Sequence, residues 1–238
     1  MAIADTGFTG RIQNLIYYKR GNRTCVRTMP ERVRQTKATK ARAGEFGRAS
    51  RIGKAIREVL LPVIPNPKDM SMQTRLVAAL FQWLQSANAR PADLAGPVSQ
   101  VTGLDLSDPG HSVRERWRVS FQVDHPSSGL IQIRIPAFVP KDSILAPAKT
   151  VSVTCKISAG SCDAATGTAL GSASLERTFV YDRTPVAAET ISMKLPTPKG
   201  SLIVTGIVLE YRVNKNGYPQ TNTNKNFMPA NIVHAMYK

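Results

Sequence analysis

The chain has 238 residues, room for one large domain or two modest ones, and a formal net charge of +16. Residues 1–60 hold 14 basic and 4 acidic side chains, so most of the surplus lies in the first quarter. A basic segment on a nearly balanced remainder indicates a polyanionic partner, nucleic acid or an acidic protein surface. A solvated, solubilising arm is the alternative interpretation.

Composition also excludes several classes of protein. The three cysteines, Cys25, Cys155 and Cys162, are too few for a disulfide framework, so reduced thiols are expected, with a Cys155–Cys162 pair as the alternative. No apolar run approaches the ~20 residues that cross a bilayer, and residues 1–10 lack the pattern of a signal peptide. We therefore expect no membrane span and synthesis in the cytoplasm, with a virion or particle assembled there as a candidate location.

Residues 10–29 predict a small basic β-hairpin, because two strand-like stretches flank the turn signal Gly21-Asn22. A lone hairpin is marginal in water and must pack on another surface. Tyr17 and Tyr18 stand among cationic residues, a composition typical of nucleic-acid surfaces, although alternation would bury one of the two. The hairpin's candidate nucleic-acid-binding residues are Lys19, Arg20, Arg23 and Arg27.

Residues 37–61 predict a helix with two different faces. One face carries mostly small apolar side chains, which permit close approach of another backbone. Its candidate assembly residues are Ala38, Phe46, Ala49, Ile52 and Ile56. The opposite face is cationic, and its candidate nucleic-acid contacts are Lys37, Lys40, Arg48, Arg51 and Lys54.

Prolines end this helix, and a second helix is expected over residues 71–88, with Trp83 in its apolar stripe as a core residue. Residues 90–112 are rich in Pro and Gly and predict a linker. The expected domains are therefore a basic hairpin and helical arm at 1–88, a linker at 89–112 and a β-rich domain at 113–238.

Beyond residue 112 the apolar period changes to two, which predicts strands with one polar and one apolar face. About seven are expected, near residues 117–123, 131–135, 151–157, 175–181, 191–195, 207–213 and 231–237. The predicted fold class is α+β, the arm being followed by an antiparallel β-sandwich of immunoglobulin or fibronectin-III type, with a jelly roll as the alternative. Residues 158–174 and 214–226 read as long loops.

Catalytic and metal-binding signals are weak. His111, His125 and His234 are each isolated in the sequence, with no ligand-type neighbour at metal-binding spacing. Residues 47–54 look faintly like a phosphate loop, but the glycine spacing is wrong and Ala55 replaces the required hydroxyl. We expect no enzyme, no cofactor and no metal site.

The arm resembles the start of a known family. The matching residues are Gly10 to Ile16, Gly21, Val26 to Pro30, Gln35, Thr36, Ala38, Lys40 and Phe46. This pattern is similar to an uncharacterised protein family common in Bacteroidetes. The resemblance implies that the hairpin–helix arm is a recurring unit followed by a β-rich part, and that a Bacteroidetes cell or its mobile elements is the source. It implies no activity.

Three functions follow as hypotheses. The first is a non-enzymatic structural protein that self-assembles into a shell, tube or filament, of phage or mobile-element origin, through its arm and its sandwich edges. The second is an architectural nucleic-acid-binding protein that uses the basic arm. The third is a carbohydrate- or protein-binding module with Tyr218 and Phe227 as loop aromatics.

Overall fold

The computed structural model describes residues 2–3, 8–29, 36–89, 95–107, 112–127, 129–222, 224 and 227–238, without the side chains of 2–3, 87–89 and 126. Backbone contacts divide the chain into two compact units. The first, Met1–Arg42, is called the N-terminal unit below, and the second, Ala43–Lys238, is called the body.

The N-terminal unit is built on a four-stranded antiparallel sheet with the order β1-β4-β3-β2. Its strands are β1 (Ala2–Ile3), β2 (Gly10–Ile12), β3 (Leu15–Arg20) and β4 (Arg23–Thr28). The predicted hairpin is confirmed, since Arg20 pairs with Arg23 across Gly21-Asn22. A turn at Gln13-Asn14 adds β2 to it, because Gln13 adopts a positive φ of 48°.

Both predicted long helices are present. Helix α1 (Lys37–Val59) begins after Thr36, whose Oγ1 accepts a hydrogen bond from the Thr39 N–H, and it ends just before the short helix η1 (Leu61–Val63). Helix α2 is Met70–Ala89. The body also has two one-turn helices, α3 (Val113–Arg116) and α4 (Pro140–Ser143).

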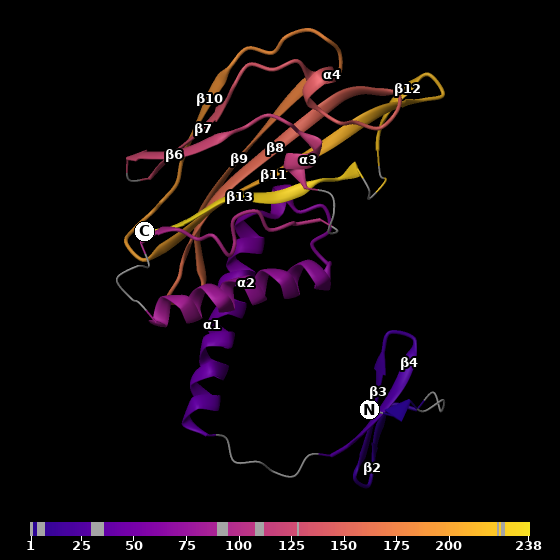
Figure 1. The fold of residues 1–238 in the computed structure, drawn as a ribbon, viewed down its shortest axis with the longest axis vertical. Helices are drawn as coiled ribbons and strands as arrows, with labels where there is room; N and C mark the ends of the chain where they lie inside the picture. The colour runs from indigo at the N-terminus through magenta and orange to yellow at the C-terminus, as the bar shows by residue number, and fades with distance from the viewer. Residues whose placement is uncertain are drawn as a thin grey trace. The chain divides into compact units, whose positions relative to one another are not determined.

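The strands of the body form two antiparallel sheets (Figure 1). The larger has the order β5-β13-β11-β8-β9, with β12 beside β11, and the smaller has the order β10-β7-β6. The strands are β5 (Gly96–Pro97), β6 (Gln122–Ser127), β7 (Leu130–Ile135), β8 (Thr150–Asp163), β9 (Thr168–Val180), β10 (Glu189–Lys194), β11 (Ser201–Lys215), β12 (Tyr218–Thr221) and β13 (Ala230–Tyr237). Helices together with antiparallel sheets confirm the α+β class.

Two buried clusters show how the layers of the body pack. The first joins α1 and α2 to one face of the larger sheet, through residues such as Ile56, Leu80 and Val204. The second joins the other face of that sheet to the smaller sheet, through residues such as Ile133 and Ile157. Helices, larger sheet and smaller sheet therefore lie in three layers. Strands β8 and β11 are covered on both faces, which corrects the expectation of one polar face per strand.

The prediction of a loop at residues 158–174 is wrong. Strands β8 and β9 continue through it as a long hairpin that turns at residues 164–167. Its small residues serve helix packing, because a Cβ at Gly160 would overlap the side chain of Val59 in α1. Close helix–sheet approach thus explains a composition that is typical of loops.

Two further stretches differ from expectation. The strand predicted at residues 117–123 begins only at Gln122, and residues 113–116 form α3. Much of the predicted linker is core, since Val98, Val101 and Leu106 are buried under the helices. The predicted division at 1–88, 89–112 and 113–238 therefore does not coincide with the compact units, because α2 and most of α1 pack into the body.

Candidate assembly and nucleic-acid surfaces

The predicted assembly face of α1 is largely occupied by the chain itself. Ala49, Ile52 and Ile56 are fully buried in the cluster that joins the helices to the larger sheet. They are not available to a second copy, so their predicted assembly role is corrected. Phe46 is 53% exposed and Ala38 is exposed, so only this end of the stripe remains at the surface.

The cationic residues of α1 divide in the same way. Lys37 and Lys40 are exposed on the first turn of the helix. Arg48 is half-buried, and its Nε donates a hydrogen bond to Ala164 O at 2.7 Å, which fastens α1 to the β8–β9 turn. Lys54 Nζ lies 3.8 Å from Glu58 Oε1 in the next turn of the helix. Arg51 is exposed, although its backbone lies against Gly167 of the same turn.

The N-terminal sheet gathers cationic residues on one of its faces. Strand pairing places Ile16 between Arg11 on one side and Arg27 on the other. It also places Arg20 opposite Arg23, and alternation along β3 puts all four arginines on the same face. This arginine face consists of Arg11, Arg20, Arg23 and Arg27, all exposed, with the Arg27 guanidinium 5.8 Å from the ring centre of Tyr18. Sequence reasoning missed Arg11, although the register set by the two hairpin turns would have found it.

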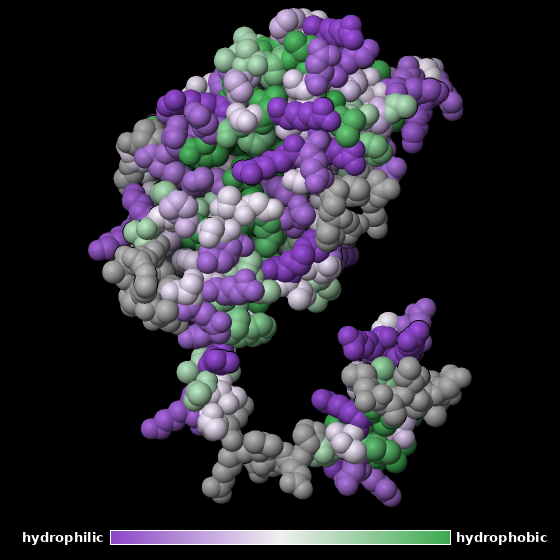
Figure 2. All heavy atoms as spheres, viewed as in Figure 1, coloured by the Kyte–Doolittle hydropathy of each residue, from purple (hydrophilic) through white to green (hydrophobic). Residues whose placement is uncertain are grey.

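The opposite face of this sheet is apolar. Register and alternation place Ile12, Leu15, Tyr17 and Val26 there, and the ring of Phe8 lies 5.6 Å from that of Tyr17. These five residues are called the apolar face below. Phe8, Ile12 and Leu15 are among the exposed large hydrophobic residues of the described chain. Hydrophilic and hydrophobic residues both reach the surface of this unit in Figure 2. Lys19, the fourth predicted hairpin cation, lies on the apolar side.

The structure brings together two histidines that the sequence keeps 109 positions apart. The rings of His125 in β6 and His234 in β13 have centroids 5.0 Å apart. Burial lowers the pKa of both rings, and for His234 the neighbouring His125 adds to the effect and brings the pKa to about 4. Asp124 opposes both shifts. His125 and His234, which are isolated in the sequence, are therefore neighbours in the fold, while His111 lies outside the described residues.

Within the described ranges, no three His, Cys, Asp or Glu side chains gather closely enough to hold a metal ion. His125 Nε2 and His234 Nδ1 are buried and have no hydrogen-bond partner among the described residues. The lowered pKa values of the two rings favour their neutral forms.

Two further expectations concern the pairing of Cys155 with Cys162 and the exposure of the loop aromatics Tyr218 and Phe227. Cys155 faces the cluster between the sheets and Cys162 faces the helices, so these two thiols on opposite faces of β8 cannot pair. The Arg116 guanidinium covers the ring of Phe227, with 4.8 Å between its Cζ and the ring centre. Tyr218, in contrast, is 74% exposed. A loop site for a carbohydrate would thus have one free aromatic among the described residues.

A comparison of the chain with protein-family models finds none that matches, and a comparison with curated proteins finds no match either. The resemblance to a Bacteroidetes family stays a prediction. Among the helices of the described residues, none has the length and apolar character needed to span a membrane.

Proposed function

We propose that the protein is a non-enzymatic structural protein that self-assembles through its N-terminal unit. The observation that carries this proposal is the apolar face of the N-terminal sheet. Within the described part of the unit, the Phe8 ring packs against that of Tyr17, yet Phe8, Ile12 and Leu15 keep 42%, 50% and 36% of their surface exposed. A sheet with one apolar face needs a second layer to bury it.

The small core of the N-terminal unit supports the same proposal. Of its described residues, only Thr24 and Cys25 are buried. An isolated sheet of this size buries too little apolar surface to offset the loss of chain entropy. A partner that covers the apolar face would therefore stabilise the sheet as well as bind it.

The occupant we propose is the N-terminal sheet of a second copy. Both copies carry the formal charge of +16, so most contacts between them are opposed by repulsion. Pairing through the apolar faces turns the two arginine faces outward, on opposite sides of a double layer whose sheets lie about 10 Å apart. This arrangement buries the apolar side chains while keeping the guanidinium groups in water.

A shell, tube or filament needs a second contact, since a symmetric pair closes on itself. We propose the edge of β9 for this role, with the two facing sheets of the body acting as a β-sandwich scaffold. The first half of β9, from Thr168 to Leu175, carries no charged side chain that would oppose strand addition. Its second half is tied to β10 by Arg177, which donates to Glu189 Oε1 at 3.0 and 2.6 Å. The immunoglobulin, fibronectin-III or jelly-roll type of the sandwich stays a prediction.

Nucleic-acid binding is the second candidate function, and the arginine face favours it. Four exposed arginines on one side of a sheet, with Tyr18 beneath Arg27, offer charge and a stacking surface. Phosphate contacts would also offset the repulsion between copies. The two functions are therefore compatible in one particle.

The assembly proposal is tested by the mass of the full chain in solution. We expect sedimentation velocity to show dimers or larger species whose share grows with concentration. The double variant Ile12→Ser, Leu15→Ser should sediment as a monomer, because it removes apolar area from the proposed interface. The matched control is Arg11→Ser, Arg20→Ser on the opposite face, which should keep or strengthen assembly. A strict monomer at high concentration for the unmodified chain overturns the proposal.

A further inference from the structure

We propose that the body binds a small organic anion, a carboxylate with an apolar portion, in a cavity between residues 117–123 and β13. The cavity has a volume of about 440 Å³. That is within the ~300–1,000 Å³ typical of small-molecule sites. The site belongs to the body alone and is independent of the assembly surfaces.

A β-bulge in β13 shapes one wall of the cavity. Thr205 pairs with His234 and Gly206 with Ile232, so Val233 is an extra residue in the ladder. Ile232 and Ala235 both face the helices, and the bulge turns Val233 and His234 toward the smaller sheet. Bulges often re-aim side chains beside binding sites. Here the bulge places Val233 on the cavity lining.

The opposite wall has the pattern of a strand, but its residues 117–121 join neither sheet, and Trp117 makes an isolated bridge to Ile144. Residues 117–123 alternate between apolar and polar side chains, yet β6 begins only at Gln122. Val119, Phe121 and Val123 line the cavity and are only partly buried. The cluster between the two sheets is therefore open at this point, and an apolar ligand would complete it.

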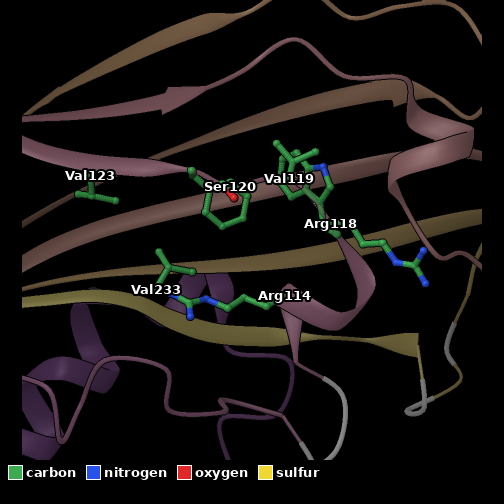
Figure 3. A pocket seen from close by; sticks show the side chains of 8 residues that line it. Arg114, Arg118, Val119, Ser120, Val123 and Val233 are labelled. Carbon is green, nitrogen blue, oxygen red and sulfur yellow. The ribbon is translucent and has the colours of Figure 1, made fainter.

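The polar groups at the cavity are almost all hydrogen-bond donors. Arg114 and Arg118 contribute guanidinium groups, and no acidic side chain is among the described lining residues. Figure 3 shows Arg114 extending from α3 toward Val233, whereas Arg118 points away from it, at the other end of the lining. A negative group bound near Val233 would therefore meet Arg114 first.

Trp117 supplies an independent observation. Its side chain is 1% exposed and lines the cavity, and its Nε1 has no hydrogen-bond partner among the described residues. An indole N–H only donates, so a buried one without an acceptor is unfavourable. Because the Nε1 atom is itself buried, an acceptor oxygen on a ligand would satisfy it only if the indole ring turned toward the cavity. Donors at the cavity and apolar walls together select an anion with an apolar portion, and disfavour cations.

The test is isothermal titration calorimetry of the full chain with 4-phenylbutyrate and with its neutral analogue 4-phenylbutanamide. We expect the carboxylate to bind at least about tenfold more tightly than the amide, because charge-assisted hydrogen bonds to guanidinium are the stronger kind. Arg114→Gln should weaken carboxylate binding about tenfold. The matched control is Arg212→Gln, an exposed arginine that does not line the cavity, which should leave binding unchanged.

A second variant tests the place of binding. Val233→Phe fills part of the cavity and should abolish binding of both compounds while the circular dichroism spectrum stays that of the unmodified protein. Absence of binding by the unmodified chain, equal affinity for acid and amide, or equal loss in Arg114→Gln and Arg212→Gln each overturns the proposal.

Discussion

Gly160 of β8 lies so close to Val59 of α1 that a Cβ at position 160 would overlap the valine side chain. Beside this contact, Ser158 Oγ donates a hydrogen bond to Val59 O at 2.9 Å. The end of α1 is thus fastened directly onto the backbone of the larger sheet.

The first prediction follows from this contact. Gly160→Ala should lower the free energy of unfolding of the body by about 3 kcal/mol, because the added methyl overpacks a buried site. The control is Gly44→Ala in α1, where nothing lies within 4 Å, so the same change should raise stability by up to about 1 kcal/mol. Urea unfolding of both variants measures the difference. Equal effects of the two substitutions would contradict the close contact.

The contact between Gly160 and Val59 also shows what sequence patterns can and cannot predict. Helices α1 and α2 and most strands follow from periodicity, because their burial repeats at the period of the element. Residues 158–174 read as a loop because small side chains mark turns as well as close packing. Composition alone does not show whether a small residue is needed for a turn or for close packing against another element.

The candidate surfaces were predictable to different degrees. The two-residue turn at Gly21-Asn22 fixes the register of β3 and β4. The sequence could therefore have predicted that Arg20, Arg23 and Arg27 lie on one face of the sheet. The partner of the α1 apolar stripe was not, since an apolar helix face packs equally well on its own sheet or on another chain. The contact of His125 with His234 depends on the order of the strands and on a β-bulge. Neither can be predicted from the alternation of polar and apolar residues along a strand.

The second prediction concerns pH. The native pKa of His234 is about 4, below its ordinary value of 6.5, and that of His125 is also lowered. Between about 6.5 and 4 the unfolded chain binds protons that the native protein does not, so stability is present above this range and falls with pH through it. Because solvent reaches part of the rings, we expect a loss of about 2 kcal/mol from His234.

Urea unfolding at a series of pH values measures this loss. His234→Gln should flatten the decline between pH 6.5 and 4 relative to the unmodified protein. A decline of unchanged steepness in the variant would show that the histidine contact does not control it.

The third prediction concerns the thiols. Burial raises the pKa of Cys155 and brings that of Cys162 to about 12, and both lie in the core of the body. Cys25 is buried in the N-terminal unit, where little core holds the sheet closed. We therefore expect Ellman's reagent to label Cys25 first and the other two only on unfolding, since thiolate formation and local opening limit the reaction. Labelling of Cys155 as fast as Cys25 would contradict the difference in stability between the two units.

The fourth prediction concerns nucleic acid. If the arginine face contacts phosphates, log affinity for duplex DNA should fall linearly with log salt, with a slope of about 0.9 per contact. Arg20→Gln, Arg23→Gln should reduce the slope by about 2 without changing sequence preference. The control is Arg212→Gln, an exposed arginine of the body that is not among the candidate nucleic-acid contacts. Fluorescence anisotropy at several salt concentrations gives the slopes, and a flat salt dependence would remove this function.

The central claim, that the apolar face of one copy packs on that of another, is tested most directly by cross-linking. Leu15→Cys and Ile16→Cys, each made in a Cys25→Ser background, place one thiol on the apolar face or on the arginine face. With a bismaleimide that spans about 10 Å, the distance between packed sheets, we expect the Leu15→Cys chain to give a covalent dimer at low concentration and the Ile16→Cys chain to stay monomeric. Equal cross-linking of the two variants, or none in either, would contradict the account.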